Sequence, residues 1–193
     1  MHYRRFACFL LGAWLAAGLF MAMVATQNFR SVDRLLAKPA APAADQLSKL
    51  GAGGRALLRY QVSEQNRWFF ETWEMLQIGL GILLLLVLLF GSNETNFTML
   101  MALLMLLIVL VQRFALTPQI VALGRVIDYV PVDQPSAERS RFWLFHSTYS
   151  GLELVKWALG FLLTARLLLR SKKKPGEADH DTNGRERRGH AAG

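Results

Sequence analysis

Four polar side chains in an otherwise apolar stretch near the end of the chain are the first residues that could support chemistry. Spacings of three, four and three positions place them on one stripe of an α-helix: His146, Tyr149, Glu153 and Lys156. Ionisable groups inside a bilayer are costly and normally have a partner or a purpose. Glu153 and Lys156 can form an ion pair that only fixes helix packing. Alternatively the stripe is a site for a small ligand or a proton, with His146 as proton carrier or haem ligand.

Further polar residues occur where the other apolar stretches begin or end. If four stretches cross the membrane in turn, these ends meet the start of the last stretch at a single membrane face. The candidates for ligand or ion binding there are Arg113, Glu71 and Glu74, and other polar residues at the same ends are Thr26, Gln27, Asn28, Gln77 and Gln112. The sequence therefore predicts a polar cluster on the face that also carries the long loops.

Metal and cofactor chemistry has weaker support. Met99, Met101 and Met105 could bind copper(I), but methionines in a leucine-rich span usually fill gaps or face lipid. His146, Met101 and Met105 are therefore only weak metal candidates, and we expect no cofactor, with haem or copper as the alternative. Cys8 is the single cysteine, which excludes an intrachain disulfide or a cysteine metal cluster.

Familiar catalytic motifs are missing from the sequence. It has no Gly-rich phosphate loop, no His-Glu-x-x-His zinc helix and no nucleophile elbow. We therefore expect no catalytic residues and a non-enzymatic protein, although a membrane enzyme is not excluded.

The composition indicates an integral membrane protein. Hydrophobic residues make up 53% of the 193 residues, and the mean hydropathy of +0.26 is high for a soluble protein of this size. Eight of the 22 basic residues lie at or beyond the end of the last apolar stretch: Arg166, Arg170, Lys172, Lys173, Lys174, Arg185, Arg187 and Arg188. The net charge of +8 therefore indicates anchoring at anionic lipid head groups rather than nucleic-acid binding.

Apolar runs predict an all-α fold, a bundle of four transmembrane helices in residues 1–170. The expected spans are residues 6–25, 73–90, 97–116 and 142–169, each long enough to cross the ~30 Å hydrocarbon layer. The first could instead be a signal peptide cleaved near Ala25, but its length and the spans that follow favour retention. Residues 171–193 predict a disordered basic tail, which could also serve as an assembly or lipid-surface contact.

The first loop predicts helical pieces separated by breaks. Residues 29–37 can continue the first helix, residues 39–42 contain two prolines, and residues 51–54 contain three glycines. From Arg55 the pattern is helical through Phe90, and Arg67 and Glu71 could pair across one turn of it.

Two further connections follow the later spans. Gly91 to Asn96 predicts a tight turn, and Thr117-Pro118 predicts the start of a short interfacial helix over residues 119–127. Pro131 and Pro135 bracket another turn.

Four spans place both termini on the same side. The basic tail and Arg4-Arg5 favour the cytoplasm for that side by the positive-inside rule. We therefore expect a multi-pass protein of the inner (plasma) membrane with cytoplasmic termini, the lipid bilayer as its partner, a possible homo-oligomer, and no nucleic-acid partner.

The chain resembles a bacterial family of unknown function that is related to the eukaryotic transmembrane-protein-205 group. The resemblance covers most of the membrane part and rests on short motifs: Trp14, Gly18 and Phe20; Leu116-Thr117-Pro118-Gln119-Ile120 with Gly124; and Phe142, His146, Tyr149, Glu153 and Lys156. It implies a four-helix membrane domain, distantly similar to copper-resistance D-type proteins and to a haem-associated protoporphyrinogen oxidase family. It implies a fold more than a function.

Overall fold

The described part of the chain is built from helices alone. The computed structural model describes residues 2–91, 95–130 and 134–170, and these contain no strand. The elements are α1 (His2–Ala37), α2 (Ala41–Gly91), α3 (Asn96–Val111), a π-helical turn (Gln112–Leu116), α4 (Thr117–Ile127) and α5 (Ala137–Arg170). The expectation of an all-α fold is therefore confirmed. The predicted tail, and parts of the turns predicted at residues 91–96 and 131–135, lie outside the described residues.

Three described helices are long and apolar enough to cross a membrane. They are His2–Ala37, Gly53–Gly91 and Asn96–Ile127, and the first three expected spans each fall within one of them. The 34-residue α5 is not among them and carries Glu153, Lys156 and Arg166. The described residues thus have the helices of a membrane protein. Length and apolar composition identify three spans, and they do not identify α5 as a fourth.

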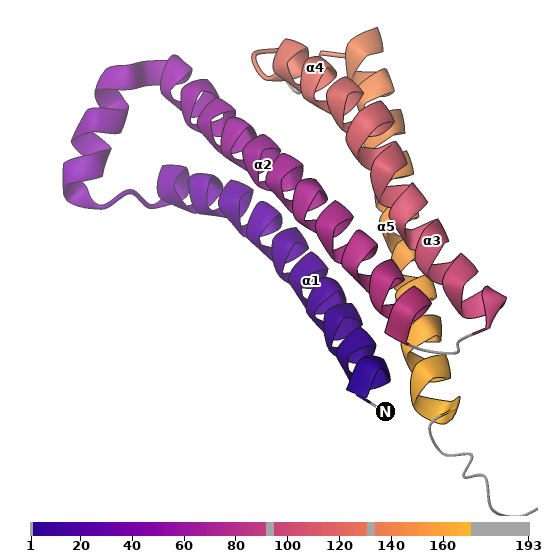
Figure 1. The fold of residues 1–193 in the computed structure, drawn as a ribbon. Coiled ribbons are helices and arrows are strands. Elements are labelled where there is room, and N and C mark those ends of the chain that lie inside the picture. The colour runs from indigo at the N-terminus through magenta and orange to yellow at the C-terminus, as the bar shows by residue number, and fades with distance from the viewer. Residues whose placement is uncertain (1, 92–94, 131–133, 171–193) are drawn as a thin grey trace, which may run out of the picture.

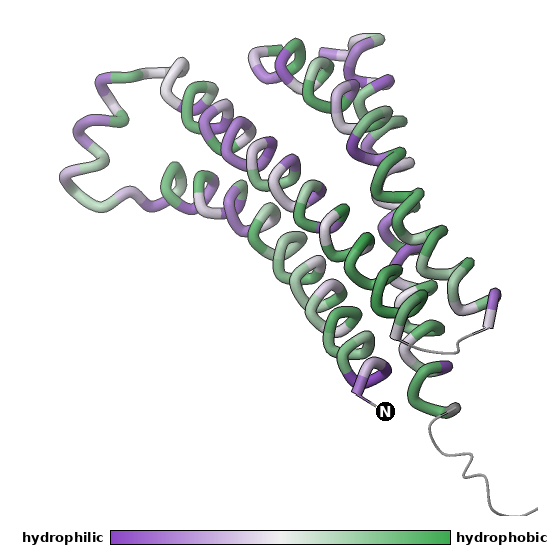
Figure 2. Tube along the Cα trace, in the orientation of Figure 1, coloured by the Kyte–Doolittle hydropathy of each residue, from purple (hydrophilic) through white to green (hydrophobic). Residues whose placement is uncertain are grey.

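The helices pack as two antiparallel pairs. α1 lies along α2, and the rod formed by α3, the π-helical turn and α4 lies along α5 (Figure 1). Contacts of α2 with α3 and of α1 with α5 join the pairs. The start of α1, the end of α2, the start of α3 and the end of α5 share one end of the molecule, and the other end carries the α1–α2 connection, the end of α4 and the start of α5. We call that other end the loop-bearing end, and it is more hydrophilic (Figure 2).

The core follows a seam on α5. Positions 149, 156, 160, 163 and 167 of this helix are buried, and their spacing of three, four or seven residues is that of helices packed side by side. Leu163 and Leu167 meet a core cluster that includes Met101 and Met105 of α3. The two methionines are 3% and 0% exposed, so they fill gaps in the bundle.

Most of the breaks predicted in the first loop are present. α1 continues through Ala37 and α2 begins at Ala41. Within α2, Gly51 adopts a φ of 57° and a ψ of −149°, and this non-helical conformation bends the helix at the glycine-rich segment. Glycine can adopt it without strain because it has no Cβ. α2 is then helical through Gly91 as expected.

The predicted pairing of Arg67 with Glu71 is wrong. Arg67 donates instead to Glu64 at 2.5 Å and to Asp128, just after α4, at 2.6 Å. Arg125 of α4 also donates to Glu64 at 2.9 Å. These two guanidinium groups lower the pKa of Glu64 to about 2, and the four charges clamp α2 to α4 at the loop-bearing end. An arginine that donates to two carboxylates forms two charge-assisted hydrogen bonds, which stabilise it more than one bond to a carboxylate on its own helix.

The helix predicted to begin at Thr117 exists but is not separate. α3 runs into α4 through the π-helical turn, so Asn96–Ile127 forms one rod. Pro118 has no N–H to donate, which interrupts the hydrogen-bond ladder here. The N–H of Thr117 donates to the carbonyl of Gln112, five residues earlier, and this wider turn replaces the expected break.

Candidate functional site

A buried lysine occupies the centre of the bundle. Lys156 of α5 is 1% exposed, and its ammonium group donates three hydrogen bonds. The acceptors are Gln77 Oε1 at 2.6 Å, Gln112 Oε1 at 3.0 Å and Glu153 Oε1 at 2.5 Å. An ammonium group has three protons, so Lys156 is fully satisfied by protein groups.

Two further donors extend the hydrogen bonds of this lysine to α1 and strengthen those with the π-helical turn. Trp14 of α1 donates its indole N–H to Gln77 Oε1 at 2.9 Å. Gln112 Nε2 donates to Glu153 Oε1 at 3.1 Å and to the backbone carbonyl of Tyr149 at 3.3 Å. We call these five residues the lysine network: Trp14, Gln77, Gln112, Glu153 and Lys156. It links α1, α2, the π-helical turn and α5, so it fixes how these elements lie relative to one another.

A second set of polar groups lies beside the network and is incompletely bonded. Glu74 of α2 is 0% exposed, and its Oε1 accepts a hydrogen bond of 2.5 Å from the Thr117 hydroxyl. Four buried polar atoms nearby have no hydrogen-bond partner among the described residues: Glu74 Oε2, Gln77 Nε2, Arg113 Nε and Tyr149 Oη. We call Glu74, Arg113, Thr117 and Tyr149 the Glu74 group.

The members of the Glu74 group come from four elements: α2, the π-helical turn, α4 and α5. Tyr149 lies close enough to the Glu74 carboxylate to interact with it electrostatically, and Arg113 also acts on that carboxylate. The π-helical turn brings Arg113 and Thr117 to the same side as Glu74. Such turns occur often at functional sites because they re-aim side chains that a regular helix would direct elsewhere.

The described residues contain no cation within ion-pair distance of Glu74. The positive charges that act on it, Arg113 and Lys156, lie farther away. Unpartnered buried polar atoms are rare in folded proteins and call for an explanation such as a bound molecule. The Glu74 group is therefore the part of the polar cluster that could hold something besides protein.

The predicted stripe on α5 is divided by the structure. Tyr149 and Lys156 are buried and Glu153 is half-buried, but His146 is exposed. The His146 ring stacks on Phe142 at 5.7 Å and meets Trp143 edge-on at 5.6 Å. His146 thus belongs to an aromatic group near the start of α5 and lies outside both polar sets.

The other candidates divide in the same way. Glu74 and Arg113 belong to the Glu74 group, whereas Glu71 is half-buried, one turn nearer the loop-bearing end. Trp14 and Thr117 are parts of the site that the sequence analysis did not select. The indole N–H of a tryptophan needs a partner when it is buried, and this was the available signal for Trp14.

The metal candidates do not converge. The described residues include no group of three or more His, Cys, Asp or Glu side chains placed to hold a metal ion. The end of Met105 lies within 3.4 Å of where a Cβ would stand on Gly160. Gly160 follows His146 by fourteen positions, about 21 Å along a helix, so His146 and Met105 cannot share one ion.

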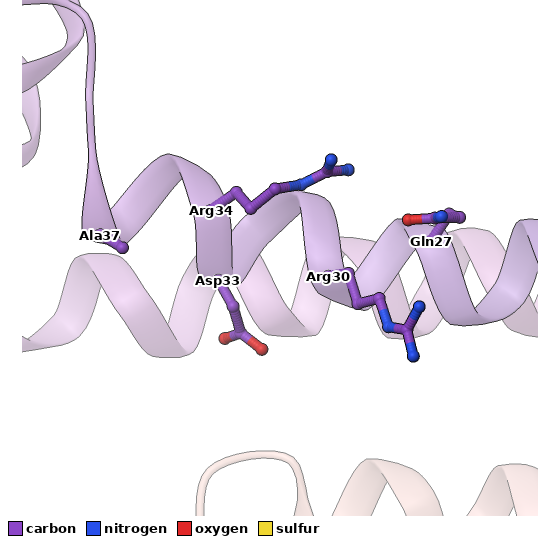
Figure 3. A pocket seen from close by; sticks show the side chains of 5 residues that line it. All are labelled: Gln27, Arg30, Asp33, Arg34 and Ala37. Atoms are coloured by element: carbon purple, nitrogen blue, oxygen red, sulfur yellow. The ribbon is translucent and has the colours of Figure 1, made fainter.

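A surface hollow on α1 offers no enclosed site. It is lined by Gln27, Arg30, Asp33, Arg34 and Ala37. These residues all come from one helix, and Arg34 and Asp33 point to opposite sides of it (Figure 3). The buried polar cluster therefore remains the candidate functional site.

Known proteins add no assignment. Comparisons with protein-family models, with curated proteins and with solved structures found no match to this chain.

Proposed function

We propose that the protein is a non-enzymatic integral membrane protein of four spans, in which α5 is the fourth. The 34 residues of α5 extend about 51 Å, more than a bilayer core requires. Two of its charged side chains have partners within the protein: Lys156 pairs with Glu153, and Arg166 donates to the hydroxyls of Thr98 at 3.2 Å and Thr95 at 3.0 Å. Arg166 also lies 5.0 Å from the centre of the Phe97 ring. Charges held in this way are compatible with a membrane-spanning helix.

The two polar sets have different roles in this proposal. The lysine network holds the helices in register, because every proton of its ammonium group is already used. The Glu74 group binds a small polar solute or an ion. The observation that carries this role is the set of four buried polar atoms without partners beside a fully satisfied lysine. The polar cluster therefore has both of the roles that the sequence analysis gave as alternatives: the lysine network fixes helix packing, and the Glu74 group binds a ligand.

The test of the binding role uses the unpartnered hydroxyl of Tyr149. Purified protein would be heated with millimolar concentrations of small polar solutes and monovalent ions, and the unfolding temperature recorded. A ligand at 100 times its dissociation constant stabilises by about 2.7 kcal/mol, and we expect at least one compound to raise the unfolding temperature of wild type by several degrees. This shift should shrink in Y149F and persist in Y129F, since Tyr129 is 60% exposed. Equal shifts in both variants would contradict solute binding at the Glu74 group, and no shift in wild type would exclude the solutes and monovalent ions tested.

The proposed topology places both termini in the cytoplasm and the loop-bearing end outside the inner membrane. It is supported by the start of α1 and the end of α5, which share one end of the molecule, and by the sequence, in which Arg4 and Arg5 begin α1 and three lysines follow α5 at residues 172–174. In a C8S background, a membrane-impermeant thiol reagent applied to intact cells should label E71C and H146C. N96C, at the α2–α3 end, should be labelled only after the cells are opened. Labelling of E71C and H146C from opposite sides would contradict the four-span arrangement.

The bilayer is the partner that this arrangement implies, and a homo-oligomer and the absence of nucleic-acid binding stay proposals. A haem- or copper-associated redox or transport protein is the alternative function. A visible spectrum and copper analysis of the purified protein separate the two, since a Soret band or stoichiometric copper would favour the alternative.

A further inference from the structure

We infer that the ion held by the Glu74 group is a proton, carried by Glu74 as a neutral carboxylic acid in the resting protein. This inference deepens the proposed function and rests on it. The reaction is the simplest that a carboxylate can make: a proton from water joins Glu74 Oε2, and the charge of the side chain falls from −1 to zero.

The first argument compares the two buried carboxyl groups of the cluster. Glu153 has Lys156 at 2.5 Å and a further amide donor from Gln112 at 3.1 Å. Glu74 is fully buried, receives one hydrogen bond from a neutral hydroxyl and has no ion pair within the described residues. Removing an unpaired carboxylate from water costs several kcal/mol even after the protein relaxes, whereas a neutral acid avoids most of this cost.

The second argument is that the neighbouring cations are unavailable to Glu74. All three protons of Lys156 are donated to Gln77, Gln112 and Glu153. Arg113 on the π-helical turn is half-buried and lies beyond ion-pair distance.

The remaining groups around Glu74 are neutral or negative. α4 contributes the Thr117 hydroxyl, α5 contributes Tyr149 and the paired Glu153, and the buried polar side chain of α1 is Trp14. Since the charges of Glu153 and Lys156 offset each other, Arg113 is the remaining cation that acts on Glu74, and it lies beyond ion-pair distance. A proton on Oε2 therefore supplies the charge that no protein group supplies.

The third argument concerns hydrogen bonds. As a carboxylate, Glu74 has one donor for two oxygens, and its Oε2 is unpartnered. The Tyr149 hydroxyl, which is also unpartnered, can donate to Oε2 of the carboxylate or accept from Oε2 of the acid. Hydrogen bonding is thus available to Glu74 in both forms, and its burial without an ion pair is what favours the neutral acid.

The surroundings also give the proton a direction of entry. Glu71 precedes Glu74 by three positions, lies on the same side of α2, and is half-buried toward the loop-bearing end. In the other direction along α2 the buried side chains after Gln77 are the leucines 84 and 88. Glu74 therefore exchanges its proton with one side of the membrane.

Infrared spectroscopy tests this inference directly, because the carbonyl stretch of a protonated carboxyl group is resolved from that of a carboxylate. Purified protein in lipid nanodiscs would be recorded at neutral pH in H₂O and D₂O, with E74Q and with E71Q as the matched control one turn away. We expect a protonated-carboxyl band in wild type and in E71Q that shifts in D₂O and is absent in E74Q. Gln keeps the acceptor oxygen for Thr117, and circular dichroism would confirm that E74Q is folded.

The outcomes separate this inference from the function on which it rests. Absence of the band in wild type at neutral pH, or its persistence in folded E74Q, would overturn the proton assignment. If E74Q does not fold, E74D replaces it, and an unchanged band frequency in E74D would also overturn the assignment. Suppose the protonated-carboxyl band is missing, but a solute still raises the unfolding temperature in a way that depends on Tyr149. The binding role would then stand, and Glu74 would be ionised.

Discussion

Replacing Glu153 alone by leucine will destabilise the bundle far more than replacing Glu153 and Lys156 together. E153L leaves a 1% exposed ammonium group without its counter-ion, and removing one partner of a buried ion pair costs about 3–5 kcal/mol. In E153L/K156M both charges are gone, Gln77 still accepts from Trp14, and Gln112 still donates to the Tyr149 carbonyl. Buried ion pairs replaced by apolar residues of similar volume often leave stability unchanged. We therefore expect the double variant within about 2 kcal/mol of wild type.

The measurement is equilibrium unfolding in mixed micelles for wild type, the single variants E153L and K156M, and the double variant E153L/K156M. The matched control is the exposed pair of Asp45 and Lys49, whose 2.9 Å ion pair has both side chains more than 60% exposed. D45A should cost less than about 1 kcal/mol, as surface pairs do. If E153L and E153L/K156M lost the same stability, the buried charge would not be the cause, and the lysine network would not fix helix register.

Local sequence patterns were sufficient to predict elements whose cause is local. The apolar runs located the first three spans, and the prolines and glycines of the first loop located the end of α1 and the bend at Gly51. The offsets of Tyr149, Glu153 and Lys156 placed them on one face of a helix. Each of these properties depends on residues within a few turns of one another.

Properties set by contacts between helices could not be predicted in this way. Periodicity indicates the buried face of a helix but not the side chain opposite it, so the partners of Lys156 on α2 and on the π-helical turn were not foreseen. Arg67 was assigned a partner on its own helix, although Asp128, 61 positions away, is one of its two partners. His146 shares its spacing with the inward residues, but it is exposed near the start of α5, where it contacts the aromatic rings of Phe142 and Trp143.

Substitution of Gly81 by leucine is expected to disrupt the packing beneath the lysine network, whereas the same substitution at Gly79 is not. A Cβ at Gly81 would stand 2.9 Å from Leu106 Cδ1 and 3.2 Å from Trp14 Cη2, and a Cβ at Gly79 would meet no atom within 4 Å. Membrane helices use small residues at such close approaches because their association depends on tight packing. Overpacking a core costs about 1–3 kcal/mol, and the gain in helix propensity over glycine, about 1 kcal/mol, applies to both positions.

Thermal unfolding of both variants in one detergent tests this, because the two positions lie on the same helix and receive the same side chain. We expect G79L to match or slightly exceed wild type and G81L to fall below it by several degrees. A displaced Trp14 should also lose its hydrogen bond to Gln77 Oε1, which leaves Lys156 as the sole donor to that oxygen. The effect of G81L should therefore be smaller in a W14F background, in which that bond is already absent. Equal stability of G79L and G81L would mean that α1 and α3 do not approach α2 at this level.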